Sequence, residues 1–291
     1  MSTNQVIIVG ASGYIGKATL AALTSRHSET LQAYAGVRNA KKFGQMDKVE
    51  TVEADMGDKD GLTEALKGFD SVFLVVPGHE QRTELAMNGI EAAKDAGVKF
   101  VLLLSVVTSG TDSVFGQQFA PVETQAKESG LDYAIVRLPL FIDNNYAHVA
   151  SIKEQSTFYD PRDPTKLHTP VAVADVGKAA ADILADPSKH YGKTYKLVSP
   201  PFSLNDMAAA FSKVLGKEVK HTSASYVAAK EAFMDMGFPE WQVDGIMELY
   251  KYIDADSELT NESETGDIEK ITGEKPLTIE AWVEQNAAGF Q

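Results

Sequence analysis

The sequence contains no cysteine and is short of basic residues. Without cysteine there is no disulfide framework, no thiolate nucleophile and no cysteine-based metal site. Asp and Glu number 41 against 27 Lys and Arg, which gives a formal net charge of −14. Because a surplus of Lys and Arg binds nucleic-acid phosphates and anionic membranes, this balance argues against both as partners.

Several other signals are missing as well. No apolar run reaches 18 residues, so no membrane-spanning helix is expected. The first five residues are uncharged, unlike the basic start of a signal peptide. The six histidines are scattered without an H-E-x-x-H pair, and there is no G-x-S-x-G elbow. We therefore expect a soluble, cytoplasmic protein with no metal site and no serine-hydrolase chemistry.

Near-continuous apolar runs alternate with helical patterns over the first half of the chain. Strands buried on both faces and separated by helices are typical of a parallel sheet. The sequence therefore predicts an α/β fold with a doubly wound parallel sheet of the Rossmann type. The expected strands are residues 5–10, 31–38, 48–55, 71–76, 99–107 and 132–141.

After Phe141 the alternation weakens and the pattern becomes mainly helical. We expect a cofactor-binding Rossmann domain over residues 1–150, to which a helix and a strand near 171–200 return. Residues 151–170 and 201–291 are expected to form a smaller, mainly helical cap or substrate-binding region. Within it, residues 252–269 carry seven acids and no base, which is typical of a solvated, mobile loop.

The stretch VGASGYIGK follows the first expected strand and opens the first helix. Glycines in such a turn let the backbone approach a pyrophosphate, and the helix N-terminus presents free N–H groups to the anion. The G-x-x-G-x-x-G spacing at this junction favours a dinucleotide site over a close-packed turn without a ligand. Ser12 either adds a hydroxyl to the phosphate or caps the helix. The candidate cofactor residues here are Gly10, Ser12, Gly13, Tyr14, Ile15 and Gly16.

The end of the second expected strand indicates which dinucleotide is bound. An NAD site places an acid there for the ribose hydroxyls, but no acid stands between Glu29 and Asp47. Arg38 takes that place, followed by Lys41 and Lys42. Because a guanidinium pairs bidentately with a phosphate, we predict NADP(H), with Arg38 and Lys42 as cofactor residues. A plain surface arginine is the alternative.

Topology adds candidates at the ends of later strands. Asp55 and Met56 would meet the edge and the face of adenine, and Val76 and Pro77 would lie where the chain passes the ribose. Each of these placements is equally compatible with ordinary loop chemistry.

Longer segments resemble the NmrA-like branch of the atypical short-chain dehydrogenase/reductases. They are VGASGYIG, AGVRN, SGLDYAIVRLPLFIDN, NDMAAAFSKVLGK and the closing ITGEKPLTIEAWVEQNAAGF. The resemblance implies NADP(H) binding, in a family that includes quinone reductase-like enzymes and redox-sensing regulators. It also implies that Arg38 meets the 2′-phosphate. The positions that it implies beside the nicotinamide are Pro139, Leu140, Phe141 and Asn144.

No complete catalytic constellation is evident. Typical short-chain dehydrogenases use a Tyr and a Lys four residues later, and Tyr226 and Lys230 have this spacing. The pair lies about 120 residues past the fifth strand, whereas it belongs on the helix directly after that strand. We therefore expect an ordinary cap helix at Tyr226.

The helix after the fifth strand lacks a tyrosine, and its only lysine, Lys127, lies near its C-terminal end. Several reductase relatives keep a lysine near the start of this helix, and Phe119 stands at that position here. Ser105 matches the place of the dehydrogenase serine, either as a cofactor neighbour or as a strand-end cap. The catalytic residues are left open.

Two functional hypotheses follow. In the first, the protein reduces quinone-like or other small acceptors with NADPH by direct hydride transfer, without a Tyr–Lys pair. In the second, it is a non-catalytic NADP(H) redox sensor that acts through a protein partner. Sugar-nucleotide epimerisation requires the Tyr–Lys pair and is set aside. Side chains expected near the acceptor are Phe141, Tyr146, Phe233 and Trp241, and His79 and His168 are expected as solvated loop residues near the cleft.

Overall fold

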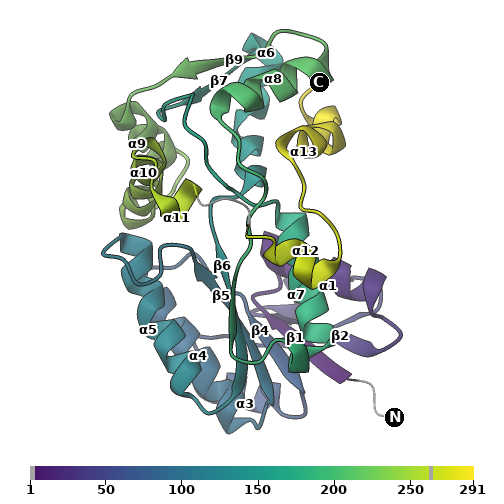
Figure 1. Ribbon diagram of the computed structural model, residues 1–291. Coiled ribbons are helices and arrows are strands. Elements are labelled where there is room, and N and C mark those ends of the chain that lie inside the picture. Colours follow the sequence, from purple (N-terminus) through teal and green to yellow (C-terminus); the bar gives the residue numbers. More distant parts are fainter. Residues whose placement is uncertain (1–3, 262–264) are drawn as a thin grey trace.

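The computed structural model describes residues 4–261 and 265–291 and is built around a seven-stranded sheet. Neighbouring strands are all parallel, in the order β3-β2-β1-β4-β5-β6-β8. Figure 1 shows this sheet below a smaller region that holds the C-terminus. The strand bounds are β1 Asn4–Val9, β2 Leu31–Val37, β3 Val49–Glu53, β4 Ser71–Leu74, β5 Phe100–Val106, β6 Asp132–Leu138 and β8 Lys193–Lys196.

Helices cover both faces of the sheet, which confirms the doubly wound fold. In Figure 1, α3, α4 and α5 lie on one side, and α1, α7 and α12 on the other. The central strands β4 and β5 are apolar except for one serine each, because both of their faces are buried. No helix in the described part of the chain is both long and apolar enough to cross a bilayer. The helix bounds are α1 Tyr14–Arg26, α3 Lys59–Leu66, α4 Arg82–Asp95, α5 Val114–Glu128, α7 Val173–Ala185 and α12 Asp267–Thr272.

The strand order reverses at β1, which has β2 on one side and β4 on the other. The chain leaves the carboxyl end of β1 toward one face of the sheet and that of β4 toward the opposite face. In open α/β sheets, this divergence leaves a crevice in which ligands bind. The fold thus places a candidate site above β1 and β4.

Residues 171–200 return to the sheet through α7 and β8. β8 extends the sheet beside β6. α7 packs so closely on α1 that a Cβ on Gly177 would lie 2.6 Å from the carbonyl carbon of Ala18. Arg26 of α1 also forms an ion pair with Asp182 of α7 at 2.8 Å. Through α7, this segment therefore holds α1 in position beside the sheet.

The smaller region has its own apolar core and a separate two-stranded parallel sheet of β7 and β9. Phe158, Phe211, Trp282 and Phe290 are fully buried in this core. A second apolar cluster joins α9 to α10 around Val243. The bounds are η1 Ile142–His148, α6 Val149–Gln155, β7 Thr157–Asp160, α8 Leu204–Leu215, β9 Lys220–Ser223, α9 Tyr226–Asp235, α10 Glu240–Asp254, α11 Glu258–Asn261 and α13 Ile279–Asn286.

The pairing of β7 with β9 is not predicted from the sequence. Each strand has four residues, TFYD and KHTS, and neither shows a clear alternation of apolar and polar side chains. Their partners are 63 residues apart along the chain, as Thr157 and Lys220 illustrate. A local pattern therefore carries no signal of this pairing.

The acidic run 252–269 does not form one solvated loop, and that prediction is wrong for its described part. α10 continues to Asp254, α11 follows, and α12 begins at Asp267. The acids have partners from elsewhere: Asp256 pairs with Lys166, and Asp267 accepts a hydrogen bond from the backbone N–H of Lys196 at 3.0 Å. Residues 262–264 lie outside the described residues.

α12 lies against α7 beside the sheet, although residues 201–291 are expected in the smaller region. Ile268 is 3% exposed and belongs to the apolar core of the sheet. Lys178 of α7 also pairs with Glu274, just past α12, at 2.8 Å. The chain thus crosses back to the sheet once more before its last helix.

Candidate functional site

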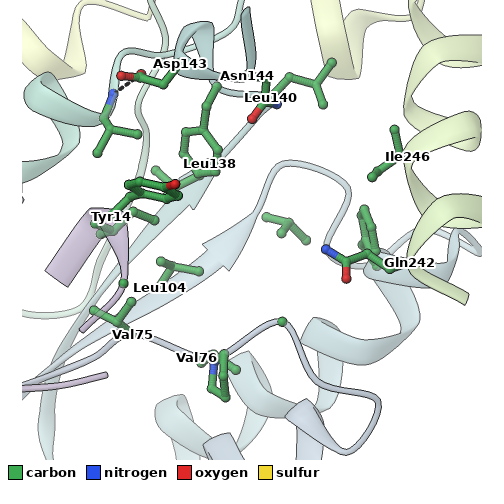
Figure 2. A pocket seen from close by; sticks show the side chains of 18 of the residues that line it. Tyr14, Val75, Val76, Leu104, Leu138, Leu140, Asp143, Asn144, Gln242 and Ile246 are labelled. Carbon is green, nitrogen blue, oxygen red and sulfur yellow. Dashed lines mark hydrogen bonds between the residues drawn. The ribbon is translucent and has the colours of Figure 1, made fainter. Parts of the chain in front are cut away.

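A cavity of about 1030 Å³ opens at the carboxyl ends of β1, β2, β4, β5 and β6 and extends to α9 and α10. Figure 2 shows Val75, Leu104 and Leu138 at the strand ends, with Gln242 and Ile246 of α10 facing them across the space. Sites for drug-sized ligands typically measure about 300–1000 Å³. This cavity therefore lies at the upper end of that range.

Two of the three turn glycines are required by packing. Gly10 has a φ of +88°, and a Cβ there would lie 2.4 Å from the carbonyl oxygen of Val75. A Cβ on Gly16 would lie 2.6 Å from the Cα of Ala11. Gly10 thus lets the turn approach β4, and Gly16 lets α1 start directly against the turn. Gly10 lines the cavity, whereas Gly16 does not.

Gly13 is different, because the protein's own packing leaves its Cβ position free. Its φ of −76° suits any residue, and a Cβ would meet only the carbonyl oxygen of Gly10, at 3.7 Å. Gly13 is the N-cap residue of α1, so the interpretation of Ser12 as the cap is wrong. Within the described residues, the backbone N–H groups of residues 14–16 have no hydrogen-bond acceptor. Free N–H groups at an open helix N-terminus suit an anion.

Arg38 lies exposed on the cavity wall directly after β2. Its guanidinium has no acidic partner within the described ranges of the chain. Lys42 lies in the short helix α2 (Ala40–Phe43) and does not line the cavity. Asp55 and Met56, after β3, do line it. A free guanidinium therefore stands at the place expected for a 2′-phosphate.

The loop after β6 is fixed by hydrogen bonds to the start of α7. Asp143 accepts a hydrogen bond from the backbone N–H of Val173 at 2.8 Å, drawn as a dashed line in Figure 2. The backbone N–H of Val171 donates to the carbonyl oxygen of Leu140 at 2.9 Å. Two hydrogen bonds thus hold this part of the cavity wall against the segment that leads into α7. The remaining predicted cofactor residues that line the cavity are Ser12, Tyr14, Ile15, Val76, Pro77, Ser105, Pro139, Phe141 and Asn144.

Ser105 is not a strand-end cap, and that interpretation is wrong. Its hydroxyl donates to Glu123 of α5 at 2.6 Å, and Arg137 donates to both oxygens of the same carboxylate at 2.9 and 2.7 Å. Burial disfavours the charge on Glu123, but hydrogen bonds from Arg137 and Ser105 outweigh burial and hold its pKa at about 2. The Ser105 proton is therefore held by Glu123. A single glutamate in a helix gave no sequence signal of this network.

Aromatic rings form the cavity wall near α5. Phe119 is 1% exposed and lines the cavity beside Phe115. Arg82, the first residue of α4, lies over these two rings, and its central carbon is 5.3 and 4.8 Å from their centroids. Burial lowers the pKa of Arg82 to about 10, which leaves the side chain charged at neutral pH. No pattern in the sequence indicates that Arg82 belongs to the site.

His168 is buried at the opposite, cap side of the cavity, so the expectation of a solvated residue is wrong for it; His79 is exposed. Arg162 forms a two-point ion pair with Asp160 at 2.8 and 2.7 Å and contacts His168 Nε2 at 3.1 Å. A guanidinium only donates, so Nε2 accepts and Nδ1 carries the proton. Burial and the charge of Arg162 hold the pKa of His168 well below its usual range. The group of Asp160, Arg162 and the neutral His168 therefore has no net charge.

Tyr226 and Lys230 lie outside the cavity wall. The Tyr226 hydroxyl donates to Asp254 at 2.7 Å, and Lys230 pairs with Asp244 at 2.7 Å. Among the residues that the structure describes, no cluster of three or more His, Asp or Glu side chains is placed to hold a metal ion. Of the aromatic side chains expected near an acceptor, Phe141, Tyr146 and Phe233 line the cavity and Trp241 does not.

Comparison with known proteins agrees with this geometry. A model of the NmrA-like family matches residues 2–283. An NAD(P)H azoreductase of Xenophilus azovorans is 29% identical over 291 residues, covering 98% of this chain and 99% of that protein. An NADPH-dependent quinone oxidoreductase from Escherichia coli, solved with NADPH, has a TM-score of 0.81 at 25% identity and covers 96% and 99% of the two chains. NmrA, a negative transcriptional regulator solved with NADP, shares the fold, with a TM-score of 0.78, 14% identity and coverage of 98% and 95%.

Glu123→Gln should destabilise the protein in a pH-dependent way. A pKa lowered from 4.5 to about 2 corresponds to about 3 kcal/mol of unfolding free energy at pH 7. Because the folded-state pKa is depressed, this contribution is present above pH 4.5 and is lost as the pH falls toward 2. Urea unfolding followed by circular dichroism should therefore show a gap from wild type that narrows between pH 7 and pH 3. An equal gap at both pH values would contradict the assignment, and Glu128→Gln, on the exposed face of α5, is the control.

Proposed function

Because the chain belongs to the NmrA-like family, we propose that it is an NADPH-dependent reductase of quinone-like or other small, flat acceptors. The observation that carries the proposal is the extent of the cavity. It continues from the predicted cofactor residues to an apolar space lined by Leu140, Phe233 and Ile246. Cofactor sensing alone would require no such space, whereas a reductase must enclose a second, flat molecule.

Three features of the cavity fit NADP(H). The free N–H groups of residues 14–16 suit the pyrophosphate. The open space at Gly13 would admit it without a clash. Arg38, exposed and without an acidic partner among the described residues, suits a 2′-phosphate through paired N–H donors. These residues would hold the cofactor, and the loop 139–144 would wall its reactive end.

Bound NADPH supplies a hydride, so a quinone would gain two electrons and one proton from it and a second proton from solvent. The chain's own part is to position and enclose the acceptor. Ser105 has its proton held by Glu123, and the buried His168 is neutral. Neither group is an acid at neutral pH, which fits acceptors that need no positioned proton donor.

A redox sensor is the second candidate function. The observation in its favour is that neither Phe119, an apolar ring, nor Ser105, whose proton is held by Glu123, is suited to donate a proton. A sensor would bind NADP(H) by the same residues and would change its contacts with a protein partner. The two candidates differ in whether hydride leaves the protein-bound cofactor.

NADPH fluorescence separates the two. Adding the protein should enhance the emission of NADPH, because an apolar cavity excludes water around it. Adding menadione or 1,2-naphthoquinone should then produce a decay that depends on protein concentration. Enhancement without decay across a panel of quinones would favour the sensor. No enhancement with NADPH or NADH would overturn both candidates.

Arg38→Ala should weaken NADPH binding about 10- to 100-fold and leave NADH binding nearly unchanged, since only NADPH has the 2′-phosphate. Titration of cofactor fluorescence measures both dissociation constants. Lys42→Ala, which alters a neighbouring cation off the cavity wall, is the matched control. Equal losses for NADPH and NADH would refute the assignment of Arg38.

Gly13→Ser should separate binding from folding. Serine is a favourable N-cap residue, and its Cβ has room, so the free energy of unfolding should be maintained or rise by up to about 1 kcal/mol. Its hydroxyl would occupy the N–H groups that the pyrophosphate needs, so NADPH affinity should fall at least about tenfold. Thermal unfolding and cofactor titration test the two effects, and unchanged NADPH affinity would count against the turn as a phosphate site.

A further inference from the structure

Arg82 combines burial, charge and an aromatic enclosure within the cavity wall. The residue is 8% exposed and lines the cavity at the start of α4. Its central carbon lies 4.7 Å from the ring centroid of Trp241 on α10, in addition to the contacts with Phe115 and Phe119 on α5. Rings from two helices therefore hold the guanidinium in place by cation–π contacts.

The Arg82 guanidinium has no polar partner. Its Nε is buried without a hydrogen bond, and no carboxylate pairs with this side chain within the described residues. The buried Arg162 and the half-buried Arg137 differ in this respect, because Arg162 is paired with Asp160 and Arg137 with Glu123. A buried guanidinium normally has such a partner, because its five N–H donors lose water on burial. Cation–π contacts stabilise the charge but accept none of these hydrogen bonds in the plane of the guanidinium.

We infer that Arg82 is an anion-binding residue of the acceptor site, which selects flat aromatic acceptors that carry a carboxylate or sulfonate. The inference rests on the proposed function only where it calls the ligand an acceptor. The binding of an anionic aromatic ligand by Arg82 does not depend on that function. The aromatic rings around Arg82 suit the flat body of such a ligand, and the unpaired N–H groups suit its anionic substituent. Since no carboxylate of the described residues pairs with this guanidinium, a ligand would supply the anion.

The phosphates of the cofactor are less suited as its partner. The free N–H groups of residues 14–16 and the exposed Arg38 already provide for a pyrophosphate and a 2′-phosphate. Those groups follow β1 and β2, whereas Arg82 follows β4 and contacts α5 and α10. In the strand order β2-β1-β4-β5, the two cations therefore lie on opposite sides of β1.

Calorimetric titration with 2-naphthalenesulfonate and its neutral analogue 2-naphthalenesulfonamide tests the inference without any turnover. Wild type, with and without NADP⁺, should bind the sulfonate at least about tenfold more tightly than the sulfonamide. Arg82→Met should abolish this preference, and Arg82→Lys should retain part of it. Lys213→Met changes the net charge equally on an exposed face of α8 away from the cavity, and it should bind as wild type does. Circular dichroism verifies that the variants are folded.

The outcomes are distinct. No preference for the sulfonate in wild type, or a preference that survives in Arg82→Met, would overturn the inference. A comparable loss of NADPH affinity in Arg82→Met would also overturn it, because Arg82 would then serve a cofactor phosphate. In turnover, the ratio of kcat/KM for 1,2-naphthoquinone-4-sulfonate to kcat/KM for 1,2-naphthoquinone should be higher in wild type than in Arg82→Met. If neither quinone is reduced, the proposed function fails, while the titration still decides the role of Arg82.

Discussion

The close contact between the turn after β1 and the end of β4 is the constraint on which the site depends. The carbonyl oxygen of Val75 would lie 2.4 Å from any Cβ at Gly10, whose φ of +88° further excludes other residues. This contact brings the N-terminus of α1 beside the β4 loop at the point where the strand order reverses. Gly16 and Gly177 act in the same way, because each allows a close backbone contact that a side chain would prevent. The open end of α1 and the cavity in front of it follow from this packing.

The distribution of charge gives that cavity its chemical character. Acids outnumber bases by 41 to 27, so an arginine in this chain has many available partners. Arg26, Arg137 and Arg162 each form an ion pair with an acidic side chain. Arg38 and Arg82 have none among the described residues, and both line the cavity. An anionic surface around unpaired cations repels anions in general but favours anions whose shape lets them enter the cavity. Salt weakens the repulsion by the exposed surface more than the attraction within the cavity.

The sequence predicted what local patterns determine. Apolar runs located the strands of the main sheet, and the position of the glycines located the turn that lines the cavity. It failed where the determining contact is remote. Glu123 on α5 is paired with Arg137 of the following strand β6, and Arg82 lies over the ring of Trp241, which is 159 positions later in the chain. The acidic run was misjudged for the same reason, since its partners Lys166 and Lys196 lie far from it in sequence.

Two cavity residues, Ser105 and His168, are unsuited to donate a proton at neutral pH, and Arg82 on the same cavity wall is a cation without an acidic partner among the described residues. Hydride addition to a quinone first leaves negative charge on an oxygen, and protonation by solvent follows easily because that oxygen is a weak base. Reduction of such an acceptor therefore gains more from a fixed positive charge than from an acid held at one position. Glu123 and Asp160 are unsuited to donate a proton, since Arg137 and Arg162 hold them ionised. A buried guanidinium beside carboxylates that are held ionised accordingly suits the proposed hydride transfer more than acid–base chemistry at a carbon–oxygen bond.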